Sequence, residues 1–294
     1  MSKQKQPSGG VGKAILVFIL ALVLLFVVSI AVSIVMLILS GQELTDLLAV
    51  LSAPQDYMSF QSDLSIYSGC VFALLDILIF GLWYRKRFIL PYRHNNAASK
   101  RGFSVLTVVT LLLLAFGSLF LSESILNGLG RLLPEMLKSY STISDALFTK
   151  VSFPPLAILY VIVLGPIAEE VIFRGLIYRF LRLKMPFMAA NIFQAVLFGI
   201  YHMNLLQGVY AFVIGLIFGF IASRGRGIRY SIVLHVLINM LSVIGTTFVT
   251  GITAFIPMPA LGISIALIIF TMFVFAFEFM PPKKKQPVPE EYRR

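Results

Sequence analysis

The apolar residues of the chain gather in eight long runs, separated by short polar segments. A helix that crosses the bilayer core needs about 20 consecutive apolar residues. A window of that length finds the runs Ala14–Leu39, Leu64–Tyr84, Phe103–Leu121, Pro154–Leu183, Phe187–His202, Leu205–Ala222, Ser231–Val249 and Leu261–Phe279. The first run is too long for the apolar core of a signal peptide and lacks a small-residue cleavage site, so we expect a retained anchor helix. The pattern predicts an all-α fold, a polytopic membrane helix bundle with about eight transmembrane helices.

The composition agrees with a membrane protein. Hydrophobic residues make up 59% of the 294 residues and charged residues 13%, and the mean hydropathy is +0.93. A soluble domain carries about a quarter charged residues, so we expect the lipid bilayer to be the solvent. The single cysteine, Cys70, lies inside an apolar run and gives no information on the redox compartment.

The net charge of +11 is distributed unevenly between the two sides of the predicted bundle. Of the 24 Lys and Arg residues, 21 fall on the side of the N-terminus, and only Arg131, Lys138 and Lys150 fall in the opposite loops. This bias follows the positive-inside rule, so we expect a multi-pass protein of the cell membrane with both termini cytoplasmic. The basic residues are expected to face anionic lipid headgroups at the cytoplasmic face. No basic soluble module remains to bind nucleic acid, and that class of function is excluded.

The spacing of the runs divides the chain into five parts. These are a cytoplasmic N-terminal tail (1–13), an N-terminal transmembrane region of three spans plus an outer loop (14–153), a core of four spans (154–250), a C-terminal span (251–280) and a basic cytoplasmic tail (281–294). The tails are polar and expected to be disordered. Ser122–Phe153 is expected to form an amphipathic surface helix, broken at Pro134, that acts as a lid or spacer.

Costly polar side chains lie in three of the four core spans. They are Glu169, Glu170, Arg174, His202, His235 and Asn239. A charged group at the centre of a bilayer costs about 3 kcal/mol or more, so each one indicates a function. Helical spacing puts Glu170 and Arg174 on one face, where they can pair, whereas Glu169 projects about 100° away from Glu170. From this angle we expect the two carboxylates to have separate roles.

A buried carboxylate beside two imidazoles and a carboxamide suits the hydrolysis of a peptide bond. Glu169 can act as the general base on water, and His202 and His235 can hold that water or a divalent metal ion that activates it. Asn239 can donate a hydrogen bond to the developing oxyanion. The pair formed by Glu170 and Arg174 would hold the catalytic helix in place.

At these residues the sequence resembles the CAAX prenyl endopeptidase and bacteriocin-processing family (CPBP, also called Abi) of intramembrane proteases. The family pattern EExxxR, FxxxH and HxxxN stands here, in order on three spans, as Glu169-Glu170…Arg174, Phe198…His202 and His235…Asn239. The resemblance implies that Glu169 is the water-activating base, that His202 and His235 complete the water or metal site, and that Asn239 serves the oxyanion. Glu170, Arg174 and Phe198 would support them. The family is described as glutamate-dependent and as metal-dependent; Glu169, His202 and His235 are the candidate metal ligands, but the HExxH spacing of zinc sites is absent and zinc is not assigned.

Three functions remain open at this stage. The first is an intramembrane endopeptidase that cuts a membrane-associated peptide or protein, with bacterial bacteriocin processing or self-immunity as its expected role. The second is a non-catalytic regulator or immunity protein that binds a partner membrane protein. The third is a proton-coupled transporter, which a buried Glu/His chain would also serve, although the spans show no paired broken helices in matching halves.

Alternative interpretations also apply to single residues. The carboxylates with Arg174 would alone be a structural ion pair, a lone His in a span is more often a packing residue, and Asn239 alone would link two helices. Asp76 lies in the middle of the second run and belongs to no motif, so its role stays open. Glu278 is expected to extend its carboxylate to the cytoplasmic boundary.

Overall fold

A computed structural model describes residues 9–40, 58–92, 102–149 and 152–280, and this part of the chain contains no β-strand. Its long helices are α1 (Val11–Ser40), α3 (Met58–Tyr84), α4 (Val105–Leu132), α5 (Pro134–Thr149), α9 (Phe187–Tyr201), α10 (Leu205–Arg224), α11 (Arg229–Phe255) and α12 (Pro257–Glu278). Short helical turns η1 (Arg85–Ile89) and η2 (Leu90–Tyr92) follow α3. The tails 1–8 and 281–294 lie outside the described residues.

The span between α5 and α9 is built from five consecutive helical segments. They are α6 (Pro154–Leu159), η4 (Tyr160–Leu164), α7 (Gly165–Glu170), η5 (Val171–Ile177) and α8 (Tyr178–Arg182), and η4 and η5 are π-helical. Together they cover Pro154–Arg182 as one span of 29 residues.

The helices match the predicted membrane-spanning runs. In the described part of the chain, six helices are long and apolar enough to cross a membrane, namely Val11–Leu39, Ser62–Ile89, Val105–Leu132, Pro154–Arg182, Leu205–Arg224 and Pro257–Glu278. The two remaining runs correspond to the shorter apolar segments Phe187–Tyr201, which is α9, and Arg229–Gly245, which is the first part of α11. The predicted all-α polytopic bundle is therefore confirmed.

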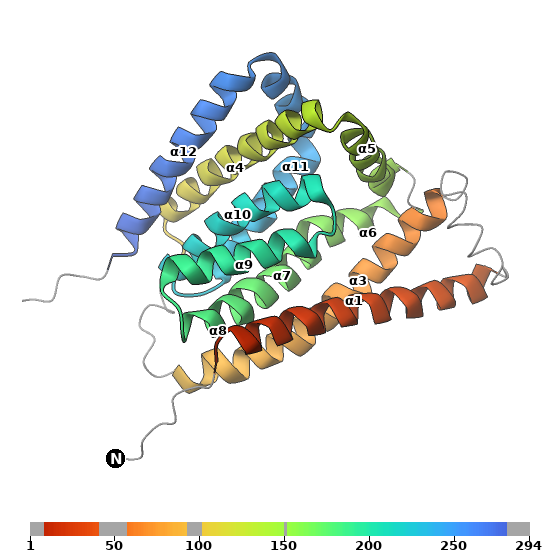
Figure 1. Cartoon of the computed structure of the whole chain (residues 1–294), viewed down its shortest axis with the longest axis horizontal. Helices are drawn as coiled ribbons and strands as arrows, with labels where there is room; N and C mark the ends of the chain where they lie inside the picture. The colour runs from red at the N-terminus through yellow and green to blue at the C-terminus, as the bar shows by residue number, and fades with distance from the viewer. Residues whose placement is uncertain (1–8, 41–57, 93–101, 150–151, 281–294) are drawn as a thin grey trace, which may run out of the picture.

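Figure 1 shows the start of α1 and the end of α12 at the same, left-hand end of the bundle. Helix α4 packs against α11 and α12, α9 packs against α10, and α1 and α3 pack against the segmented fourth span. The fourth span thus lies between the first two spans and the α9–α11 group, and the side chains of its segment Val171–Ile177 are all buried.

Helices α9 and α10 approach each other so closely that only glycine fits at the contact. A Cβ atom on Gly199 would lie 2.6 Å from the carbonyl oxygen of Gly208, and one on Gly208 would lie 2.9 Å from that of Gly199. Small residues at such contacts let helices in a membrane associate through backbone packing. The turn between the two helices is short, with Met203 in the left-handed region (φ 51°) and Asn204 capping α10 by accepting from Gln207 N at 3.1 Å.

One expectation about the segment Ser122–Phe153 needs correction. The break at Pro134 is present, but residues before it belong to α4, which continues to Leu132, and only α5 is a separate helix. At the other end of α4, Glu278 Oε1 accepts hydrogen bonds from Ser104 Oγ at 2.5 Å and Thr107 Oγ1 at 2.6 Å. The carboxylate therefore ties the end of α12 to the N-terminal turn of α4, where the helix dipole favours a negative charge.

Candidate active site

The segment that carries Glu169 and Glu170 is a single α-helical stretch between two π-helical turns. A π-helical turn bonds residue i to i−5 and so shifts the angular position of the side chains that follow it. Such turns occur mostly as short insertions, and frequently at functional sites. Val171–Ile177, directly after the two carboxylates, is buried throughout.

A chain of three buried side chains forms the centre of the site. Glu170 Oε1 accepts from Arg174 Nη1 at 2.8 Å and from His235 Nδ1 at 3.2 Å. Glu170 and Arg174 are fully buried, and the ring of His235 is 8% exposed. The predicted pairing of Glu170 with Arg174 is confirmed. Since an ionised carboxylate only accepts hydrogen bonds, His235 Nδ1 is the donor in this contact, and in a neutral ring Nε2 would be left as an acceptor.

Glu169 lies on the other side of the same imidazole ring. Its Oε2 is 3.7 Å from His235 Nε2, and its side chain is 21% exposed. Both carboxylates therefore lie near His235, because its two ring nitrogens face in different directions and span the angle between neighbouring helical residues. Glu170 is fully buried and its charge is balanced by Arg174, whereas the side chain of Glu169 is partly exposed.

Aromatic rings surround the guanidinium of Arg174. Its Cζ lies 4.2 Å from the ring centre of Phe198 and 4.8 Å from that of Phe218. Phe218 also stacks on His235, with ring centres 4.5 Å apart. Rings placed in this way stabilise a cation without adding a second negative charge. Phe198 therefore packs against the polar centre, as expected.

His202 lies at the end of α9, where the helix tightens. The backbone N–H of His202 donates to Gly199 O at 3.3 Å rather than to Phe198 O four residues earlier. The carbonyl of Phe198 is thus left for the side chain, and His202 Nδ1 lies 2.8 Å from it. Because a carbonyl only accepts, Nδ1 is the donor, and in a neutral ring Nε2 would be left as an acceptor. The edge of Phe198 contacts His202 (ring centres 4.8 Å) and His235 (6.1 Å), so both imidazoles border one phenylalanine ring.

Asn239 completes the hydrogen bonding of the first π-helical turn. Gly165 N–H donates to Tyr160 O, five residues back, so the next donor in this pattern would be residue 166, bonding to Val161 O. Residue 166 is proline and has no N–H. Asn239 Nδ2 supplies the missing donor, at 2.8 Å from Val161 O. The amide has a second N–H, so this structural bond leaves one donor for other use.

Sequence reasoning left Asp76 and Gln194 without a role. Asp76 in α3 is fully buried, both of its carboxylate oxygens lack a hydrogen-bond partner among the described residues, and it lies close enough to Glu169 for their charges to interact. Gln194 Nε2 donates at 2.8 Å to Gly215 O, a carbonyl that also accepts from Arg174 Nη2 at 3.4 Å. The only signal in the sequence for either residue was a polar side chain inside an apolar run.

Among the residues that the structure describes, no three His, Cys, Asp or Glu side chains form a group spaced to hold a metal ion. A metal ion at Glu169, His202 and His235 stays a prediction.

The fold and the buried polar centre define a class: a polytopic all-α membrane protein with paired carboxylate and imidazole groups in its interior. Residues 151–241 match the family model described as Type II CAAX prenyl endopeptidase Rce1-like. The chain is also similar to a protein of Bacillus subtilis (strain 168) with the name "Putative membrane peptidase YdiL", at 30% identity over 153 residues. No solved structure matches significantly.

These two matches support the CPBP family, and the resemblance stated from the three motifs is confirmed. The aligned region covers 51% of this chain and 59% of the Bacillus relative, so the chain spans less than two thirds of the length of that relative. At the level of the family, the matches support a membrane protease. The family match contains all seven motif residues from Glu169 to Asn239.

Proposed function

We propose that this protein is an intramembrane endopeptidase that hydrolyses a membrane-associated peptide or protein with water activated by Glu169. The observation that carries this proposal is the position of His235 between two unlike carboxylates. Glu170, which is enclosed and paired with Arg174, fixes Nδ1, and Glu169, which is 21% exposed, faces Nε2 at 3.7 Å. The two groups are too far apart for a direct hydrogen bond and close enough for one water molecule to bridge them.

In the proposed reaction Glu169 accepts a proton from this water as the water oxygen attacks the scissile carbonyl carbon. His235 Nε2 and His202 Nε2 accept hydrogen bonds from the water or from the substrate amide and so orient them. The free N–H of Asn239 donates to the oxygen that becomes negative in the tetrahedral intermediate. Glu169 then passes its proton to the leaving amine, and the C–N bond breaks.

The finer parts of the proposal follow from the sequence. We place both termini in the cytoplasm, since the basic residues concentrate at the ends of the spans on that side. The core 154–250 would hold the catalytic residues, and the first three spans and α12 would enclose it. Bacteriocin processing or self-immunity is the biological role we propose, and a divalent metal ion at Glu169, His202 and His235 is a further option.

The test compares purified wild-type protein with Glu169→Gln in detergent, using a library of fluorogenic peptides attached to a lipid. Glu135→Gln on α5 is the matched control, because it removes one carboxylate from a helix outside the polar centre. We expect a loss of at least a hundredfold in cleavage for Glu169→Gln and none for Glu135→Gln. Equal cleavage by wild type and Glu169→Gln, with a cellular phenotype that also survives the substitution, would instead favour the non-catalytic regulator.

A further inference from the structure

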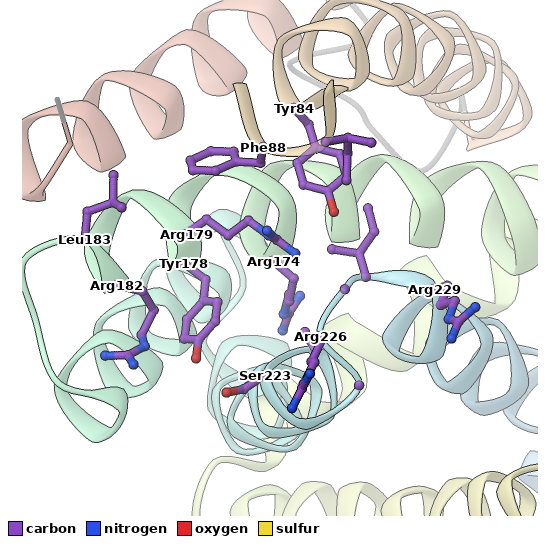
Figure 2. A pocket seen from close by; sticks show the side chains of 15 residues that line it. Tyr84, Phe88, Arg174, Tyr178, Arg179, Arg182, Leu183, Ser223, Arg226 and Arg229 are labelled. Atoms are coloured by element: carbon purple, nitrogen blue, oxygen red, sulfur yellow. The ribbon is translucent and has the colours of Figure 1, made fainter. Parts of the chain in front are cut away.

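A cavity of about 570 Å³ lies between the end of the fourth span and the turn that joins α10 to α11. One wall is formed by Arg174, Arg179 and Arg182, and the opposite wall by the turn Gly225–Arg229, with Tyr84 and Phe88 closing the side. Figure 2 shows arginine side chains coming to this space from both walls. The cavity is therefore a separate space from the gap between Glu169 and His235, although Arg174 belongs to both.

The lining carries a large excess of positive charge. Five arginines line the cavity, and among the residues that the structure describes no Asp or Glu does. Arg174 is paired with the carboxylate of Glu170. Arg179 is held by two aromatic rings, with its Cζ 5.3 Å from the centre of Tyr84 and 5.7 Å from that of Phe88. Like charges around one cavity repel one another, and a bound anion relieves this repulsion.

The start of α11 adds to this positive potential. The 27-residue helix begins at Arg229, and its N-cap residue, Ile228, forms no side-chain capping bond to the first turn. Gly227, Ile228 and Arg229 all line the cavity. Uncapped N–H groups and the helix dipole at a helix N-terminus favour an anion, above all a phosphate.

We propose that this cavity binds the phosphate headgroup of an anionic phospholipid. Two features favour a phosphate over a carboxylate: four arginines beyond Arg174 exceed the single charge of a carboxylate, and guanidinium groups bind phosphate oxygens in pairs. Two features favour a lipid over free phosphate: the cavity is several times the volume of a phosphate ion, and Phe88, Ile89, Leu183 and Ile228 give it an apolar lining suited to the glycerol and upper acyl chain. Basic pockets between transmembrane helices are a known way to hold such headgroups.

The bound lipid has a consequence for the active site. The lipid would contact both α8 and the start of α11. Helix α8 follows the segment that carries Glu170, and α11 carries His235. Lipid binding therefore stabilises the relative position of the two helices. The lipid site and its effect on stability do not depend on the proposed proteolysis.

The test measures thermal unfolding and lipid binding by native mass spectrometry for the full-length protein in a neutral detergent. The probes are phosphatidylglycerol, phosphatidylcholine, inorganic phosphate and a peptide with a free C-terminal carboxylate. Arg226→Gln is compared with Arg224→Gln, because Arg224 lies two residues away, at the end of α10, and does not line the cavity. Arg182→Gln is a second variant from the other wall, in case Arg226→Gln does not fold.

We expect phosphatidylglycerol to raise the melting temperature of the wild type and of Arg224→Gln by several degrees, and phosphatidylcholine to have no such effect. Arg226→Gln and Arg182→Gln should each bind phosphatidylglycerol about fivefold more weakly, since one basic residue contributes about 1 kcal/mol to such binding. The proposal is wrong if Arg224→Gln weakens binding as much as they do, if inorganic phosphate protects as well as the lipid, or if only the peptide carboxylate protects. Absence of cleavage by the wild type, with lipid binding as expected, would count against the proposed function alone.

Discussion

The imidazole of His235 joins Glu170 to Glu169, with Nδ1 3.2 Å from Glu170 Oε1 and Nε2 3.7 Å from Glu169 Oε2. Glu169 and Glu170 are adjacent in one helix, and the ring of His235 from another helix lies near both. Glu170 is thus a structural carboxylate and Glu169 an accessible one. The difference lies in burial: Glu170 is fully buried and Glu169 is 21% exposed. This arrangement leads to a direct test of the two roles.

Glu170→Gln and Glu169→Gln are expected to affect different properties. Glu170→Gln leaves the buried guanidinium of Arg174 without its counter-charge, which should lower the free energy of unfolding by about 3 kcal/mol. Glu169→Gln should change stability by less than about 1 kcal/mol and abolish cleavage. Thermal unfolding in detergent and peptide cleavage of the two variants measure this difference. A Glu170→Gln protein as stable as the wild type would show that the ion pair does not hold the helix.

Asn239 and Pro166 are expected to be coupled through the carbonyl of Val161. Asn239→Ala removes the donor to Val161 O and should cost about 1 kcal/mol. Pro166→Ala introduces a backbone N–H that can donate to the same carbonyl, so the double variant should be less destabilised than the sum of the single variants. A double-mutant cycle on melting temperatures measures this coupling. Strict additivity would contradict the compensation of Pro166 by Asn239.

The contact between α9 and α10 should not tolerate a side chain at Gly208. Gly208→Val places atoms within about 3 Å of Gly199 O, so the helices must separate, and we expect a loss of about 3 kcal/mol and of cleavage. Gly81→Ala on α3 is the control, because a Cβ there meets no atom within 4 Å. That substitution should raise stability by about 0.5 kcal/mol through the lower entropy of the unfolded chain. Equal melting temperatures for the two variants would argue against the close contact.

We expect Asp76 to lower the stability of the protein and to increase the activity of the site. Its two carboxylate oxygens have no hydrogen-bond partner among the described residues, and burial of such a group is unfavourable. Asp76→Leu should therefore raise the melting temperature, whereas it should reduce cleavage, because the substitution removes a polar group near Glu169. Ser118→Ala removes a polar group from a fully buried position in α4 and is the control for general effects of such a removal. A destabilised Asp76→Leu protein would indicate a structural partner instead.

Much of the fold and part of the site could be predicted from the sequence. Each spanning run is a local property, since a helix in lipid must satisfy its own backbone hydrogen bonds and needs only enough apolar residues in succession. The pairing of Glu170 with Arg174 is also local, because four residues make about one helical turn. The motif spacing around His202, His235 and Asn239 was sufficient to name the family, but not to place these residues relative to one another.

What remained was decided by contacts between helices. The sharing of His235 by Glu169 and Glu170 depends on where α11 meets the fourth span, and the bond from Asn239 to Val161 depends on a π-helical turn that apolar periodicity does not reveal. The cationic cavity requires Arg174 and Arg226, 52 positions apart, to line one space. The sequence by itself determined which segments enter the membrane, because that depends on composition along one helix. Only the tertiary structure determined the roles of the polar residues, because hydrogen-bond geometry depends on the rotation and depth of one helix against another.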